Sequence, residues 1–281
     1  MSKLYTPTEK GFDSRLEAID RCQVGLLREL VGQQGNRLIL KGGVAMRAAL
    51  GSMRLTKDIY FDRDPSLSQD ALKKGLLNNL VRAATTAGIR GPKAEITKDT
   101  KTTVRARLQG LLAGGADVRF DVEVSGRGSP DRSNLRAEIV APPPRYGMAP
   151  FRVTTYTNEA LAVMKIAAAL SEQRHAPRDL YDLRDLVHAG VDPTGLLARQ
   201  DGDLLRDFAA RALGKLEMLS YPLAQQELLP YLPSAERDAL SEDAWLDATL
   251  LVAERVAQWC EDALERQRHD ATDRSPMDGG G

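Results

Sequence analysis

The chain has 281 residues, of which 42% are apolar and 28% charged, and its basic and acidic side chains balance to a formal net charge of zero. This length is enough for one large or two smaller globular domains. No window is long and apolar enough to span a bilayer, and the N-terminal residues lack the apolar stretch of a secretory signal peptide. Neither Cys22 nor Cys260 has a cysteine nearby in the sequence, which argues against a disulfide framework and favours a reducing, cytoplasmic location.

Charge is distributed unevenly along the chain. Residues 41–110 contain 14 Lys or Arg and 6 Asp or Glu, whereas residues 201–281 contain 8 and 17. A basic N-terminal part suits a polyanionic substrate. The alternative is that solvated faces differ in charge without any functional meaning.

The first half of the chain is predicted to be mixed α/β. Helical apolar spacing predicts a helix over 14–33, followed by a strand at 37–41, a helix at 43–50, a strand at 57–62 and a helix over 68–88. Alternating residues predict strands at 94–97, 102–112 and 116–125, the last two joined by a turn at 113–115. A polar loop over 126–135 and an irregular crossing at 142–147 precede a short strand at 151–155.

From residue 158 onward the pattern is helical. Helices are predicted at 158–173, 178–189, 203–219 and 242–267, with short helices between them. The predicted organisation is an α/β core with an N-terminal helix over 1–150, a helical domain over 151–268 and a disordered tail over 269–281.

The stretch 40–62 combines a strand, a glycine pair and a carboxylate on the next strand. Gly42 and Gly43 lie where the first predicted strand becomes a helix, so that bare backbone N–H groups at the helix N-terminus can receive a phosphate. Asp58 begins the next strand and is suited to hold a magnesium ion that accompanies the phosphate. The sequence therefore predicts a phosphate site at this junction.

Carboxylates on two strands are predicted to meet beside it. Side chains at alternate positions share a face, which groups Asp58, Tyr60 and Asp62 on one strand. On strand 116–125 the same rule directs Asp121 away from the core. If the two strands are neighbours, Asp58 and Asp121 meet. A two-metal site places its ions about 3.5–4 Å apart and normally needs three carboxylates, of which two are present.

Lys165 shares a predicted helix face with apolar residues, so its ammonium group is expected to be half-buried and to need an anionic partner. Asp179 and Asp182, on the next helix, are candidates that would tie the two helices together. A bound triphosphate is the other candidate, and the sequence leaves both open.

The chain resembles the AbiEii/AbiGii-type nucleotidyltransferase toxins, which include the mycobacterial tRNA-nucleotidyltransferase toxins. The resemblance covers roughly 36–190 and is carried by Lys41-Gly42-Gly43-Val-Ala-Met, Arg54-Leu-Thr56-Lys57-Asp58-Ile, Phe120-Asp121-Val, Lys165 and Arg178-Asp179-Leu-Tyr-Asp182-Leu. It implies an α+β fold, in which a polymerase-β-like mixed sheet with flanking helices precedes an all-helical C-terminal domain. It also implies Mg²⁺-dependent transfer of a nucleotide from an NTP to an RNA acceptor, tRNA in the studied branch, and a cognate antitoxin or a phage-defence role.

The resemblance also assigns roles by position. The residues implied in nucleotide binding are Lys41, Gly42, Gly43, Thr56, Lys57, Lys165, Arg178 and Asp179. Metal binding is implied for Asp58 and Asp121, with Tyr60 where the family has an aspartate, and the implied catalytic residues are Asp58, Asp121, Lys165 and Asp182.

Tyr60 departs from the family pattern. A phenol, with an ordinary pKa of about 10, is a poor magnesium ligand, and Asp62 lies about 6.6 Å further along the strand. Three accounts stay open: a pseudoenzyme that binds nucleotide or a protein partner without catalysis, an inactivated copy of an active enzyme, and replacement of the missing ligand by Asp62. A helical interaction module over 190–267 is a further alternative.

Overall fold

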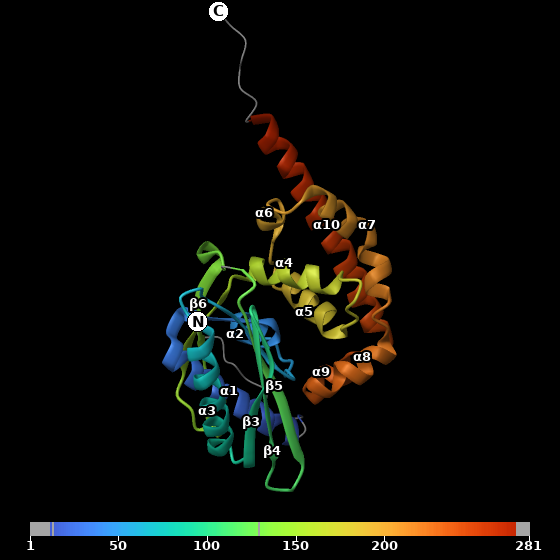
Figure 1. The fold of residues 1–281 in the computed structure, drawn as a ribbon. Coiled ribbons are helices and arrows are strands. Elements are labelled where there is room, and N and C mark those ends of the chain that lie inside the picture. Colours follow the sequence, from blue (N-terminus) through green and yellow to red (C-terminus); the bar gives the residue numbers. More distant parts are fainter. Residues whose placement is uncertain (1–11, 13, 129, 274–281) are drawn as a thin grey trace, which may run out of the picture. The chain divides into compact units, whose positions relative to one another are not determined.

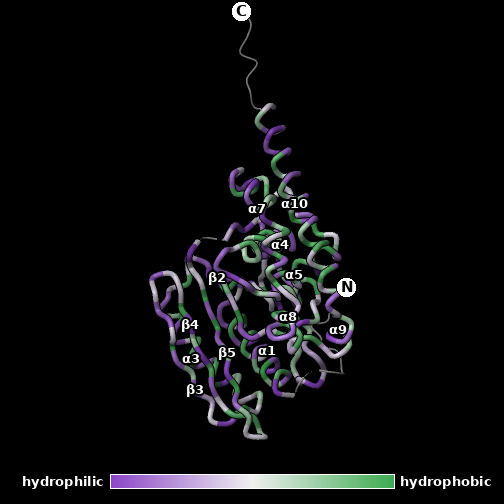
Figure 2. Tube along the Cα trace, turned by 90° about the vertical axis from the view of Figure 1, so that its right-hand side faces the viewer, coloured by the Kyte–Doolittle hydropathy of each residue, from purple (hydrophilic) through white to green (hydrophobic). Residues whose placement is uncertain are grey.

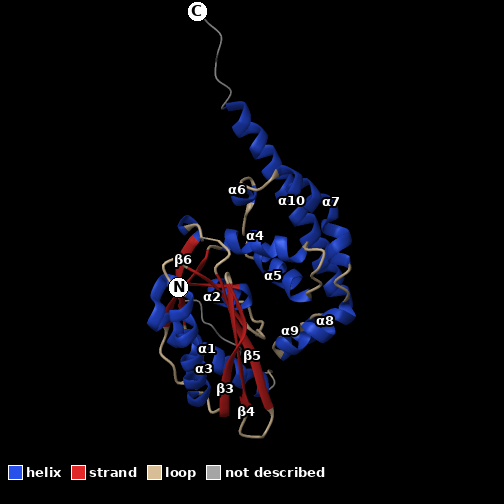
Figure 3. Ribbon diagram, viewed as in Figure 1, coloured by secondary structure: helices blue, strands red, loops and turns tan. Residues whose placement is uncertain are grey.

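The computed structural model describes residues 12, 14–128 and 130–273, and the chain divides into two compact units. The first unit comprises the residues up to 157 together with 230–238, and the second comprises 158–229 and the residues from 239 onward. Every strand of the described residues belongs to the first unit, and the second is helical (Figures 1 and 3). The expected α+β class, a mixed sheet with flanking helices and a helical C-terminal part, is confirmed.

The first unit contains a sheet and the helices that flank it. Its helices are α1 (Ser14–Gln34), α2 (Gly42–Leu50), α3 (Gln69–Thr86) and most of α9 (Ser234–Ala239). Its strands are β1 (Leu38–Lys41), β2 (Ile59–Arg63), β3 (Arg90–Thr100), β4 (Thr103–Leu111), β5 (Asp117–Ser125), β6 (Leu135–Val140) and β7 (Phe151–Tyr156).

The sheet is mixed, with the strand order β3-β4-β5-β2-β1-β7-β6. The pairs β2–β5 and β1–β7 are parallel, and the other neighbours are antiparallel. Strand β1 therefore lies beside β7, and β2 lies beside β5, although the members of each pair are far apart in the sequence. This pairing brings the end of β1, the start of β2 and the middle of β5 to one region of the sheet.

Alternation along the strands separates the sheet into a buried and a polar face. The apolar residues of β2 and β5 are buried, namely Ile59, Phe61, Val118, Phe120, Val122 and Val124. Figure 2 shows the alternation of hydrophilic and hydrophobic residues along the β4–β5 ribbon. Helix α3 packs on β3 and β4, and α1 packs on α3 and β5. Buried and exposed side chains thus alternate along these strands as predicted, and the intervening charged residues lie on the other face.

A buried ion pair fastens α2 to α1. Arg47 and Asp20 are each at most 2% exposed, and the two terminal nitrogens of the Arg47 guanidinium bond the carboxylate. Tyr146 donates its hydroxyl to the same carboxylate at 2.8 Å. Burial and the neighbouring Asp20 raise the pKa of Tyr146, so it remains a donor. The pair thus fixes the position of α2, the helix that begins at the diglycine.

One strand was not expected. The segment between the polar loop and the 142–147 crossing forms β6, which pairs antiparallel with β7 from Leu135↔Tyr156 to Val140↔Phe151. It is an edge strand whose residues are mostly exposed or half-buried. An edge strand needs no alternation of buried apolar residues, so the sequence gives little signal of it.

The second unit is built from helices. They are α4 (Asn158–Ala169), α5 (Pro177–His188), α6 (Thr194–Leu197), α7 (Gly202–Glu217), α8 (Tyr221–Glu227) and α10 (Glu242–Asp273). Helix α10 packs against α5, α6, α7 and α8, and it extends through 269–273 of the predicted tail. The rest of that tail, 274–281, lies outside the described residues. Within the described part of the chain, no helix has the length and apolar content to cross a membrane.

Candidate active site

The strand-to-helix junction of the first unit is shaped by its two glycines. Helix α2 begins at Gly42, whose φ of +70° is a conformation that side-chain-bearing residues rarely adopt. A Cβ on Gly43 would lie 2.6 Å from both the Arg54 guanidinium and the Thr56 methyl group, so only glycine fits there. Backbone N–H groups at a helix N-terminus are the groups expected to bind a phosphate.

Asp58 and Asp121 come together as the sequence predicts. The parallel register of β2 and β5 pairs Ile59 with Val122, which places the residue before each of them side by side. Oδ1 of Asp58 accepts a hydrogen bond from the backbone N–H of Asp121 at 2.9 Å, across 63 positions of sequence. Two carboxylates therefore lie close together on the polar face. The neighbouring strand β1 leads directly into the N-terminus of α2.

Tyr60 lies between these carboxylates and the diglycine. Its hydroxyl is 3.3 Å from Oδ2 of Asp58, to which it donates. A Cβ built on Gly42 would be 3.3 Å from Cδ2 of the Tyr60 ring. The ring thus covers the bend at which a triphosphate is expected.

Two arginines of β4 pair with the carboxylates of β5. The β4–β5 register places Arg107 opposite Asp121 and Arg105 opposite Glu123. Arg107 bonds both oxygens of Asp121, at 2.8 and 3.0 Å, and Arg105 bonds Glu123 at 2.9 Å. The hydrogen bond to Asp121 raises the pKa of Arg107, with burial opposing the rise, so this guanidinium stays charged. The carboxylate predicted to bind metal is therefore already neutralised.

A pocket of about 350 Å³ opens beside these residues. We call it the Asp58 pocket; its charged lining consists of Asp58, Asp121, Arg15, Lys57, Arg107 and Arg119. Thr56 and Tyr231 also line it, and the ammonium group of Lys57 lies 5.5 Å from the centre of the Tyr231 ring. Thr56 and Lys57, predicted to bind nucleotide, thus share one cavity with the predicted metal ligands.

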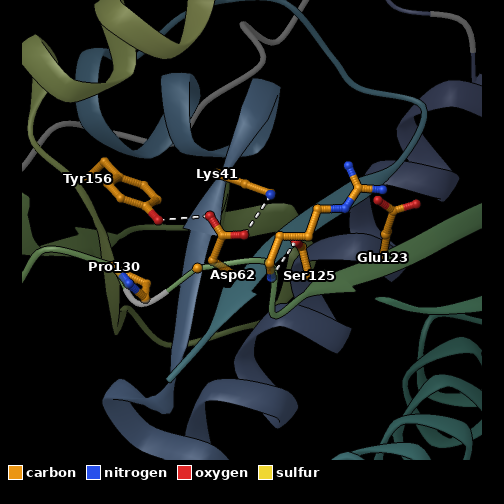
Figure 4. Close-up of a pocket in the computed structure, with 8 residues that line it drawn as sticks. Lys41, Asp62, Glu123, Ser125, Pro130 and Tyr156 are labelled. Atoms are coloured by element: carbon orange, nitrogen blue, oxygen red, sulfur yellow. Dashed lines mark hydrogen bonds and ion pairs between the residues drawn. The ribbon is translucent and has the colours of Figure 1, made fainter. Parts of the chain in front are cut away.

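A second pocket, of about 370 Å³, lies further along the same strands (Figure 4). Lys41, Asp62, Glu123, Ser125 and Tyr156 are among its lining residues. Asp62 is held from two sides, by Nζ of Lys41 at 2.7 Å and by the Tyr156 hydroxyl at 2.8 Å. Burial and the neighbouring Asp62 raise the pKa of Tyr156, which keeps its proton. The Asp62 and Lys41 side chains therefore both belong to this second pocket.

The side chains present do not fit a pair of divalent ions. Both oxygens of Asp121 are bonded by Arg107, one oxygen of Asp58 accepts a backbone N–H, and the other accepts the Tyr60 hydroxyl. Among the described residues, no group of three or more His, Cys, Asp or Glu side chains could hold a metal ion. Two aspartates and the Tyr60 phenol form an incomplete donor set for two magnesium ions.

The remaining predicted residues belong to the second unit. Lys165 is 9% exposed and bonds two fully buried carboxylates, Asp179 at 2.8 Å and Asp182 at 2.5 Å. Burial alone would raise the pKa of Asp179, but Lys165 and Arg174 lower it to about 2. The helix-tying pair considered from the sequence is therefore formed between α4 and α5. Arg178 lies half-buried on α5, and the nucleotide and catalytic roles of all four predicted residues stay predictions.

Three residues at or beside the candidate site were not predicted from the sequence. Arg105 and Arg107 alternate with buried Val104, Ala106 and Leu108, and a hairpin turning at 113–115 would have placed Arg107 opposite Asp121. That signal was present in the sequence. Tyr231 carried no such signal, because it returns to the first unit from a helical region through a backbone bond from Leu55 N–H to its carbonyl.

A family model described as nucleotidyl transferase AbiEii toxin, Type IV toxin–antitoxin system, matches residues 26–258. The chain belongs to this family. This match confirms the family expected from the motifs.

Comparison with solved structures gives distant matches to this AbiEii-family chain. JHP933 from Helicobacter pylori matches with a TM-score of 0.57 at 16% identity, over 94% of this chain and 100% of that one. MenT4, a nucleotidyltransferase toxin from Mycobacterium tuberculosis, matches with a TM-score of 0.45 at 17% identity, over 93% of each chain. A search of curated proteins finds no match.

Proposed function

We propose that this AbiEii-family chain has the scaffold of a toxin that transfers a nucleotide from an NTP to RNA, with tRNA as the acceptor. In such a transfer an acceptor hydroxyl attacks the α-phosphorus of the NTP, a new phosphodiester bond forms, and pyrophosphate leaves. The Asp58 pocket would hold the nucleotide, with its phosphates directed to the diglycine. Type IV systems pair a toxin with an antitoxin, so a cognate antitoxin is the expected partner. The toxin would act in the cytoplasm, where its proposed substrates, NTP and tRNA, are found.

The observation that carries the proposal is the meeting of Asp58 and Asp121 beside the Gly42–Gly43 junction. Carboxylates at that place, next to a helix N-terminus, are what phosphoryl-transfer sites use to position a triphosphate. The basic lining of the same pocket suits a polyanion.

We further propose that Tyr60 impairs this particular chain. An aspartate at position 60 would complete three carboxylates with Asp58 and Asp121, the set suited to Mg²⁺. The ring also covers Gly42, so it would keep the phosphates away from the N-terminus of α2. The second candidate, a pseudoenzyme that binds nucleotide or a protein without catalysis, is favoured by the Arg107–Asp121 pair, which leaves the site closed to metal but basic.

The test restores the carboxylate. Purified wild-type, Tyr60→Asp and Tyr60→Phe proteins are incubated with each of the four labelled NTPs and total tRNA, with and without Mg²⁺. Tyr60→Asp is expected to label tRNA at least about 100-fold faster than the wild type, because metal sites lose activity on this scale even when outer contacts are removed. Tyr60→Phe keeps the ring without the carboxylate and should stay inactive. Equal labelling by Tyr60→Asp and the wild type would refute the proposed impairment.

A further inference from the structure

The carboxylates of the Asp58 pocket are already bonded by groups of the protein. Four basic residues and two acidic residues line it, and Arg107 already occupies both oxygens of Asp121. The remaining carboxylate, that of Asp58, is occupied by a backbone N–H and a hydroxyl. The positive charge that a divalent ion would bring to this place is therefore supplied by the protein itself.

Two further cations line the pocket. Lys57 and Arg119 are exposed, and in the described part of the chain no ion pair is recorded for either side chain. The ammonium group of Lys57 lies over the Tyr231 ring in the same cavity. Arginine binds phosphate oxygens in a bidentate manner, and a metal-free triphosphate carries its full negative charge to such groups.

We propose that the Asp58 pocket binds the polyphosphate of a nucleoside triphosphate through its arginine and lysine side chains, without a divalent ion. This inference rests on the proposed function, in which the same pocket holds the nucleotide. It differs from the family scheme in its ligand, which is the metal-free nucleotide. Arg107 has a double role, since it neutralises Asp121 and presents its charge to the phosphates.

The experiment measures the affinity of the wild-type protein for each of the four NTPs and for inorganic triphosphate by calorimetry, in EDTA and in excess Mg²⁺. Binding in EDTA is expected to be at least as tight as in Mg²⁺, and to weaken as salt rises because it is electrostatic. Arg119→Ala and Lys57→Ala should each weaken it by about tenfold, the effect of one charge-assisted hydrogen bond. Lys74→Ala, which removes an exposed lysine on α3, should leave it unchanged.

Asp121→Asn should change the affinity for NTP in opposite directions for metal-dependent and metal-free binding. Loss of this carboxylate would weaken a metal-dependent site, but in the arginine-dependent pocket it releases Arg107 and removes a repelling charge. The affinity for NTP in EDTA is therefore expected to rise in Asp121→Asn. In Tyr60→Asp, by contrast, Mg²⁺ is expected to tighten binding.

The outcomes distinguish this inference from the proposed function. Wild-type binding that occurs only with Mg²⁺, or affinity that falls in Asp121→Asn in EDTA, would overturn metal-free binding and leave the nucleotidyltransferase scaffold standing. Absence of NTP binding by both the wild type and Tyr60→Asp, under either condition, would overturn both. Unchanged affinity in Arg119→Ala and Lys57→Ala would also overturn the inference.

Discussion

Replacing Lys165 by methionine should destabilise the helical unit, because Lys165 neutralises two carboxylates that are fully buried. The pKa of Asp179 is lowered to about 2. Relative to about 3.9 in the unfolded chain, this shift corresponds to about 2 to 3 kcal/mol of stability at neutral pH. Removal of one partner of a buried pair costs about 3–5 kcal/mol, and we expect a loss at the lower end because Arg174 still bonds Asp179.

The sign of the pH dependence follows from the same shift. A carboxylate with a lowered pKa contributes stability that is present above about pH 4 and is lost as the pH falls towards 2. In Lys165→Met, Asp179 loses one of the two cations that lower its pKa, so its pKa rises and it takes up a proton at a higher pH than in the wild type. The difference in stability between wild type and variant should therefore be largest near pH 7 and shrink towards pH 4.

Urea unfolding followed by far-UV circular dichroism at the two pH values measures this difference. Lys73→Met is a matched control, because Lys73 also bonds two carboxylates, Asp70 at 3.0 Å and Asp99 at 2.9 Å, but these are exposed. Solvent screens such pairs, so its loss should be much smaller. If Lys165→Met costs no more than Lys73→Met, or costs the same at both pH values, the reasoning about the buried cluster is wrong.

Two glycine substitutions test the packing of the first unit. Gly43→Ala would place a methyl group 2.6 Å from Arg54 and Thr56. The free energy of unfolding in urea should fall by about 1–3 kcal/mol, and NTP binding should weaken. Retained affinity for NTP would show that the junction does not contact the phosphates. Gly110→Ala would place its Cβ 2.4 Å from Cγ2 of Ile89 and should cost a similar amount, about 1–3 kcal/mol; an unchanged unfolding midpoint would contradict that close contact.

Much of the fold followed from local patterns. Helices and most strands were predicted close to their observed positions, because alternation and helical spacing depend only on neighbouring residues. The edge strand β6 was missed because it buries little. The two compact units are not two continuous segments, since 230–238 joins the first unit, and no local pattern signals this return.

The candidate site divides in the same way. The glycine pair, the shared face of Asp58 and Tyr60, and the outward direction of Asp121 are properties of single elements, and the sequence alone determined them. That β2 pairs with β5 in a register joining Asp58 to Asp121, and that Arg107 occupies this carboxylate, was decided by the tertiary structure. The physical reason is that strand partners are chosen by burial of the whole sheet, whereas side-chain direction is set by the pleat of each strand.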